Sequence, residues 1–155
     1  MKRSDKKLGA ILVEKKIISA SQLDNAISEQ EFTREFIGAI LIKKGYVSER
    51  DLLNALSEQF GIPFYSLKDI YIDWGLVEKF NPSTILENKC FPVKREKDSI
   101  TIAILNPLDA WALKKAEDGA RGLAAKFVLV SQSDMEEAIK RYKQFMRRSA
   151  SDMLE

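Results

Sequence analysis

The feature that most constrains this chain is a 24-residue segment that occurs twice near its N-terminus. Residues 7–30, KLGAILVEKKIISASQLDNAISEQ, return as residues 36–59, FIGAILIKKGYVSERDLLNALSEQ, with 12 identical positions and no gap. A segment that recurs at a fixed spacing is one structural unit used twice, and such units bury their apolar faces against each other. The N-terminal part is therefore predicted to fold as two similar, mutually packed pieces.

Each copy has the pattern of two short helices joined by a break. In the first copy, Leu8, Ile11 and Leu12 recur at the spacing of one helical face. After the break, Ser19 is followed three residues later by Gln22, which is a capping-box pattern at the start of a second helix. Residues 7–60 are thus predicted to form two helical hairpins, one for each copy.

The break between the helices differs between the copies. Gly45 stands at the break of the second copy and suits the left-handed position that follows a helix. Lys16 takes the equivalent place in the first copy, where it must accept strain or end its helix differently. Ser48, with Asp51 three residues later, is expected to cap the next helix.

The pattern changes after residue 60 to short strands and helices. The expected elements are a strand at 64–67, a helical turn capped by Asp73, a helix from Pro82 capped by Asn81, strands at 90–95 and 99–105, a helix capped by Asn106 that ends at Gly119, a strand at 125–131, and a helix at 133–146 capped by Ser133. This half is predicted to be a small sheet with helices packed on one side.

The predicted fold class is α+β: an N-terminal pair of tandem helical hairpins, with four short helices, followed by a small β-sheet with helices packed on it. Residues 1–60 are expected to form the repeat subdomain, and residues 61–146 the α+β subdomain. Hydrophobic periodicity stops near residue 147, so 147–155 is interpreted as a linker or as a cut end of the chain.

The composition argues against catalysis. The chain has no histidine and one cysteine, so the usual zinc sites and the Ser-His or Cys-His nucleophile pairs are excluded. Cys90, beside a predicted strand, is interpreted as a buried inert thiol. No P-loop motif is present, and the carboxylates lie mainly on polar helix faces. We therefore expect a non-catalytic domain.

Hydropathy and charge indicate where the chain is located and which partners are disfavoured. No apolar run is long enough for a membrane span, and a cytoplasmic location is expected. The net charge of +2 does not by itself indicate nucleic acid. The second helix of each copy also carries acidic residues, Glu29 in the first and Asp51 and Glu58 in the second. Acidic side chains there disfavour recognition of the base edges of a nucleic acid.

Two residue types recur at equivalent places in the copies. Gly9 and Gly38 lie near the start of a helix, where glycine is disfavoured by about 1 kcal/mol relative to alanine. Either another helix or a ligand could approach the backbone there, and helix packing is the ordinary explanation for either glycine alone. Gln30 and Gln59 end the apolar faces, where solvent exposure is usual, but two equivalent glutamines also fit a shared polar partner.

The tandem pattern [RK]-L-G-x-x-L-x-x-x-G, then L-x-x-x-L-x-x-Q, with a five-residue spacer before the second copy, resembles the MshEN-type N-terminal domain of type II secretion and type IV pilus assembly ATPases. The stretches EQFGIPFYSL and FPVKREKDSITIAILNPLD resemble the same domain. The family includes members that bind cyclic di-GMP. This chain has Lys7 where the family has arginine, Lys16 where it has glycine, and Ile37 where leucine is usual.

The resemblance implies a set of ligand-binding residues. Leucines would supply a flat apolar surface, glycines a close backbone approach, glutamine a guanine partner and the cation a phosphate partner. Asp109 could accept from guanine N–H groups, although a place in the second helical turn, favoured by the helix dipole, is its ordinary role. The implied residues are Lys7, Leu8, Gly9, Leu12, Leu23, Ile27, Gln30, Ile37, Gly38, Leu41, Leu52, Leu56, Gln59 and Asp109.

Two functions follow from the resemblance. In the first, the chain is a regulatory domain that binds cyclic di-GMP and couples it to a C-terminal ATPase, toward which 147–155 would be the linker. No other cofactor and no metal is expected. In the second, the chain is a docking module that attaches the ATPase to the inner-membrane platform protein without binding a nucleotide. Both place the domain in the cytoplasm, peripheral to the inner membrane through a partner.

Overall fold

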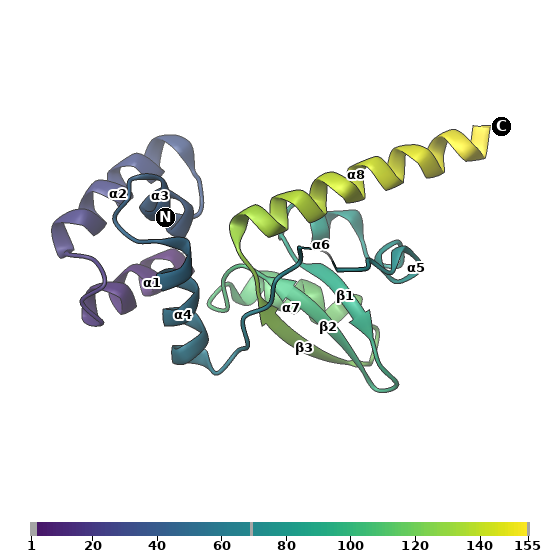
Figure 1. Ribbon diagram of the computed structural model, residues 1–155, viewed down its shortest axis with the longest axis horizontal. Coiled ribbons are helices and arrows are strands. Elements are labelled where there is room, and N and C mark those ends of the chain that lie inside the picture. The colour runs from purple at the N-terminus through teal and green to yellow at the C-terminus, as the bar shows by residue number, and fades with distance from the viewer. Residues whose placement is uncertain (1–2, 69, 155) are drawn as a thin grey trace. The chain divides into compact units, whose positions relative to one another are not determined.

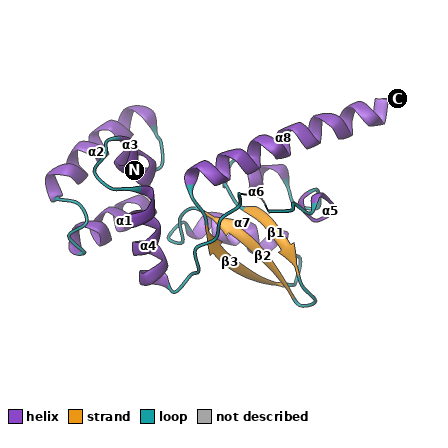
Figure 2. Ribbon diagram, in the orientation of Figure 1, coloured by secondary structure: helices purple, strands orange, loops and turns teal. Residues whose placement is uncertain are grey.

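The computed structural model describes residues 3–68 and 70–154, which form helices and one sheet (Figure 1). The chain divides into two compact units. The first unit comprises Met1–Gly61 together with Asn106–Ala110, and the second comprises Ile62–Leu105 and Trp111–Glu155. Helices and a small sheet occur together, so the predicted α+β class is confirmed (Figure 2).

The first unit contains the four helices of the repeat, two from each copy. They are α1 (Arg3–Glu14), α2 (Ala20–Thr33), α3 (Ile37–Lys43) and α4 (Glu49–Phe60). Helix α3, the first helix of the second copy, packs against both helices of the first copy. The core of this unit is aliphatic and is built from both copies; it includes Leu8, Leu12, Ile37, Ile40, Leu41 and Leu56, none more than 1% exposed.

The second helix of each copy begins at a serine cap. Ser19 Oγ accepts a hydrogen bond from the Gln22 backbone N–H at 3.1 Å, and the Gln22 side chain accepts from the Ser19 N–H at 2.9 Å. Ser48 Oγ accepts from the Asp51 N–H at 3.0 Å. Each bond satisfies a backbone donor that has no partner within the helix. Both predicted caps are confirmed.

The first helix of each copy ends in the same backbone motif. The N–H of Ile17 donates to the Leu12 carbonyl at 3.0 Å, and the N–H of Tyr46 donates to the Leu41 carbonyl at 3.0 Å. These are the long bonds of a Schellman motif, which needs a left-handed residue just before the donor. That residue is Gly45 at φ 76° in the second copy and Lys16 at φ 61° in the first. Lys16 therefore takes the strained alternative.

The second unit is a three-stranded sheet with helices around it. Its elements are α5 (Trp74–Val77), α6 (Pro82–Leu86), β1 (Phe91–Arg95), β2 (Ser99–Ile104), α7 (Ala110–Gly119), β3 (Ala124–Leu129) and α8 (Gln132–Leu154). The strand order is β1-β2-β3, with β1 antiparallel and β3 parallel to β2. The caps at Asp73 and Asn81 are confirmed, and Cys90 is buried.

The prediction that helices cover one side of the sheet is wrong. All six residues of the central strand β2 are buried. Because successive side chains of a strand point to opposite faces, both faces of the sheet must be covered. The predicted strand at 64–67 is also wrong: only Phe64 pairs, in a single parallel bridge to Leu129.

Two predicted helix starts lie a few residues from the observed ones. The Asn106 side chain accepts from the Leu108 N–H at 3.0 Å and closes a turn, so α7 begins at Ala110. The cap of α8 is Ser131, whose Oγ accepts from the Asp134 N–H at 3.0 Å, in place of Ser133. The predicted end of that helix at residue 146 is wrong as well, because α8 continues to Leu154.

Candidate functional site

The two glycines of the repeat lie at equivalent contacts within their hairpins. A Cβ atom built on Gly9 would lie 2.6 Å from Cδ1 of Leu23, and one built on Gly38 would lie 2.9 Å from Cδ2 of Leu52. Each glycine in a first helix thus admits the first leucine of the second helix. At Gly38 the Phe36 ring also comes within 2.6 Å of the Cβ position. Close helix packing accounts for both glycines.

Most of the apolar residues implied by the resemblance lie inside the first unit. They are Leu8, Leu12, Ile37, Leu41, Leu52 and Leu56, with exposed fractions of 4% or less. In this arrangement they support the helices and offer no surface to a ligand. The implied residues with accessible side chains are fewer: Lys7 and Gln59 are exposed, and Leu23, Ile27 and Asp109 are half-buried.

The two glutamines have different surroundings. Gln30 is 7% exposed, and its amide Nε2 donates to the Glu35 carbonyl at 2.9 Å. This bond ties the end of α2 to the spacer that leads into α3. Gln59, at the equivalent place in α4, is exposed. One glutamine therefore supports the chain reversal between the copies, and the other faces solvent.

Asp109 lies in the short segment that joins β2 to α7. Residues Asn106–Ala110, which include Asp109, belong to the same compact unit as the four helices. The Asp109 N–H donates to the Asn106 carbonyl at 3.2 Å, within the turn that precedes α7. Asp109 thus stands directly before the helix, and the predicted place in its second turn is wrong. The unit that holds both repeat motifs also holds this carboxylate.

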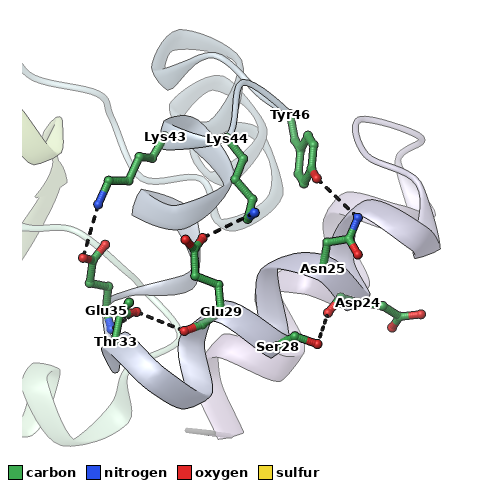
Figure 3. Close-up of polar contacts among 9 residues, drawn as sticks. All are labelled: Asp24, Asn25, Ser28, Glu29, Thr33, Glu35, Lys43, Lys44 and Tyr46. Carbon is green, nitrogen blue, oxygen red and sulfur yellow. Dashed lines mark hydrogen bonds and ion pairs between the residues drawn. The ribbon is translucent and has the colours of Figure 1, made fainter.

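A group of polar contacts that the sequence pattern does not predict joins the two copies (Figure 3). Lys44 Nζ lies 3.6 Å from Glu29 Oε2, and Asn25 Nδ2 donates to Tyr46 Oη at 3.3 Å. We call these four residues the α2–α3 seam, since they link α2 to the end of α3. Beside the seam, Lys43 Nζ lies 3.5 Å from Glu35 Oε1.

Two of the four seam residues lie in a segment that the sequence repeats. The segment NA-x-SEQ is identical in the two copies, at 25–30 and 54–59, and it contains Asn25 and Glu29. Their partners Lys44 and Tyr46 belong to the other copy, and the repeat alone does not indicate which copy's residues meet. No cluster of metal-ligating side chains occurs in the part of the chain that the structure describes.

Comparison with known proteins decides the family. A family model described as the MshEN domain matches residues 60–149. The chain belongs to the MshEN domain family. The match covers the α+β part of the chain, so the assignment does not depend on the helical repeat from which the resemblance was first drawn.

Individual relatives agree with this family. The type IV pilus assembly ATPase PilB of Myxococcus xanthus is 30% identical over 136 residues, or 88% of this chain and 24% of PilB. A structure of MshE with cdg, which abbreviates cyclic di-GMP, is 28% identical at a TM-score of 0.68, covering 92% of this chain and 99% of that one. The N-terminal domain of XpsE shares the fold at 19% identity and a TM-score of 0.67, covering 91% of this chain and 96% of that one.

This chain spans about a quarter of the length of the curated relative that it matches. Among the described residues, no helix is both long and apolar enough to cross a membrane. The candidate site therefore consists of the accessible residues of the two motifs. These residues lie on a core that both copies share.

Proposed function

We propose that this MshEN domain is the N-terminal regulatory domain of a type II secretion or type IV pilus assembly ATPase, and that it binds cyclic di-GMP through its two repeat motifs. The observation that carries the proposal is the likeness to MshE with cdg, which extends over 92% of this chain at 28% identity. The likeness spans the helical unit as well as the sheet.

The accessible residues have chemistry that suits this ligand. Cyclic di-GMP carries two phosphate charges and two guanine rings. Lys7 offers a mobile ammonium group for a phosphate, although it lacks the planar fork of arginine. Leu23 and Ile27 offer half-buried apolar surface, and the Gln59 amide has a donor and an acceptor for a guanine edge. The Asp109 carboxylate has oxygens that can accept hydrogen bonds from adjacent N–H donors of a guanine.

The buried motif residues have a supporting role in this proposal. Leu8, Leu12 and Leu41 fix the position of α1 against α3, and therefore the spacing of the two motifs. Gly9 and Gly38 allow each hairpin to close tightly. A preformed spacing lowers the ordering cost that binding must overcome.

Isothermal titration of the 155-residue chain with cyclic di-GMP, with GTP as the control ligand, tests the proposal. We expect saturable heat with cyclic di-GMP and none with GTP. Lys7→Ala should weaken binding by roughly fivefold, the value of one exposed charge-assisted contact. No heat and no thermal shift at ligand far above micromolar concentration would exclude cyclic di-GMP as the ligand.

A docking function is the second candidate, and the exposed aromatic residues of the second unit favour it. Tyr71 is 86% exposed and Trp111 is 60% exposed. Aromatic side chains of this kind are enriched at protein interfaces. In this proposal the unit binds the inner-membrane platform protein, which would hold the ATPase in the cytoplasm at the membrane surface.

Capture of the chain by the cytoplasmic part of the platform protein tests the docking function. We expect Tyr71→Ser and Trp111→Ser to reduce capture, while Phe32→Ser, at an exposed aromatic residue of the first unit, leaves it unchanged. Capture that is equal for all three variants would argue against Tyr71 and Trp111 as docking contacts. Ligand binding and docking are compatible, because they use different units.

A further inference from the structure

The ligand proposed above would draw on residues from both copies, so the spacing of the copies must be set by contacts between them. The aliphatic core holds α1, α2 and α3 together but is non-directional. The α2–α3 seam adds directional contacts between the second helix of one copy and the end of the first helix of the other (Figure 3).

The ion pair of the seam is partly shielded from water. The side chains of Lys44 and Glu29 are 31% and 38% exposed, but the Glu29 Oε2 atom itself is buried and makes no hydrogen bond. Within the described residues, the Lys44 ammonium at 3.6 Å is the partner that the structure places beside this oxygen. A buried carboxylate oxygen without a cation is costly, so Glu29 favours the position of α3 that brings Lys44 close.

Helix α3 depends on such contacts more than its neighbours do. It has seven residues, and Phe36 at its N-cap gives no side-chain hydrogen bond to the first turn. Helices this short are unstable alone in water and take their position from tertiary contacts. Gly38 lies within α3, and the left-handed turn at Gly45 follows the end of this helix.

Among the residues that the structure describes, the equivalents of Glu29 and Lys44 in the repeat do not form such an ion pair. Lys15 is the equivalent of Lys44, and Glu58 is the equivalent of Glu29, each displaced by 29 residues. Both are exposed, and the described part of the chain shows no ion pair at either one. The pair Glu29–Lys44 is therefore a feature of the junction between copies and not of each copy.

We infer that Glu29 and Lys44 are positioning residues for the proposed cyclic di-GMP site. Their ion pair holds the first helix of copy two against the second helix of copy one, so that the two half-sites are correctly spaced before the ligand binds. This inference rests on the proposed function. Neither residue needs to touch the ligand.

Charge reversal separates positioning from simple attraction, because the ligand is an anion. Attraction alone predicts that Glu29→Lys strengthens binding, since it adds a cation near the site. Positioning predicts that Glu29→Lys and Lys44→Glu each weaken binding, by about fivefold, because like charges then face each other. The double variant Glu29→Lys/Lys44→Glu should return to within about twofold of the unmodified chain.

The matched controls are Lys15→Glu and Glu58→Lys, which make the same charge changes outside the seam. Titration with cyclic di-GMP should find both within about twofold of the unmodified chain. Lys44→Arg keeps the charge and should keep the affinity. Unchanged or tighter binding by Glu29→Lys, or a double variant that stays as weak as the single ones, overturns the inference.

Hydrogen exchange without ligand keeps the two proposals apart. Amides of Ile37–Lys43 should exchange faster in Glu29→Lys and Lys44→Glu, and at the original rate in the double variant, while global stability changes little. If the unmodified chain binds no cyclic di-GMP, the proposed function fails on that result alone. If it binds but α3 exchanges equally in every variant, the positioning role is refuted and the function stands.

Discussion

The two copies of the repeat have the same backbone plan but use their equivalent side chains differently. Both close a hairpin by placing a leucine on a glycine, and both end the first helix in a Schellman motif. Yet Gln30 holds the junction while Gln59 faces solvent, and Glu29 pairs with Lys44 while Glu58 is exposed. Local sequence sets the shape of each copy, and its place in the pair sets what its side chains contact.

The largest expected change in the free energy of unfolding tests whether the two copies contribute equally to the core. Leu12 and Leu41 are equivalent, and both are 0% exposed. Leu12→Ala and Leu41→Ala should each lower the free energy of unfolding by about 3 kcal/mol, because each leaves a cavity in a shared core. Urea unfolding followed by circular dichroism measures this. A difference of more than about 1.5 kcal/mol between them would contradict an equal contribution.

The left-handed turns give an intermediate effect of opposite sign in the two copies. Lys16→Gly should stabilise the chain by about 1 kcal/mol, since a residue with a Cβ atom is strained at φ 61°. Gly45→Lys should destabilise it by a similar amount. Thermal unfolding should show shifts of roughly 2–4 °C in opposite directions. As a control, Lys15→Gly, one residue earlier, should not stabilise the chain.

The glutamines give the smallest effect and separate structure from binding. Gln30→Ala should cost roughly 0.5–1 kcal/mol of stability, because the Glu35 carbonyl loses its donor. Gln59→Ala should leave stability unchanged and weaken cyclic di-GMP binding, because its amide is exposed. Urea unfolding and calorimetry on the same samples test both expectations. A stability loss in Gln59→Ala, or intact binding, would show that the glutamines do not differ in this way.

Much of the local structure was predictable from residue types that act on their own neighbours. Ser19, Ser48 and Gly45 were correctly placed because a cap or a left-handed turn needs only a few adjacent residues. The starts of α7 and α8 were misplaced by two or three residues because each region has two polar candidates close together. Asn106 closes a turn before α7, and Ser131 caps α8 in place of Ser133.

The candidate site was predictable only as a set of residues. The MshEN family model matches the chain, and the motif positions follow from the repeat. The sequence could not separate motif residues that support the core, such as Leu8 and Leu41, from those with accessible side chains, such as Lys7 and Gln59. Amphipathic periodicity marks the inner face of a helix, but the depth of burial depends on what packs against it.

The sequence by itself determined the doubled hairpin, its caps, its turns and the α+β plan, because these depend on short-range hydrogen bonds and on the hydrophobic period. Only the tertiary structure decided that Glu29 meets Lys44 across the copies, that Gln30 and Gln59 differ, and that Asp109 shares a unit with the repeat. These contacts join residues distant along the chain, and their formation depends on how the helices pack, which equivalent sequences leave open.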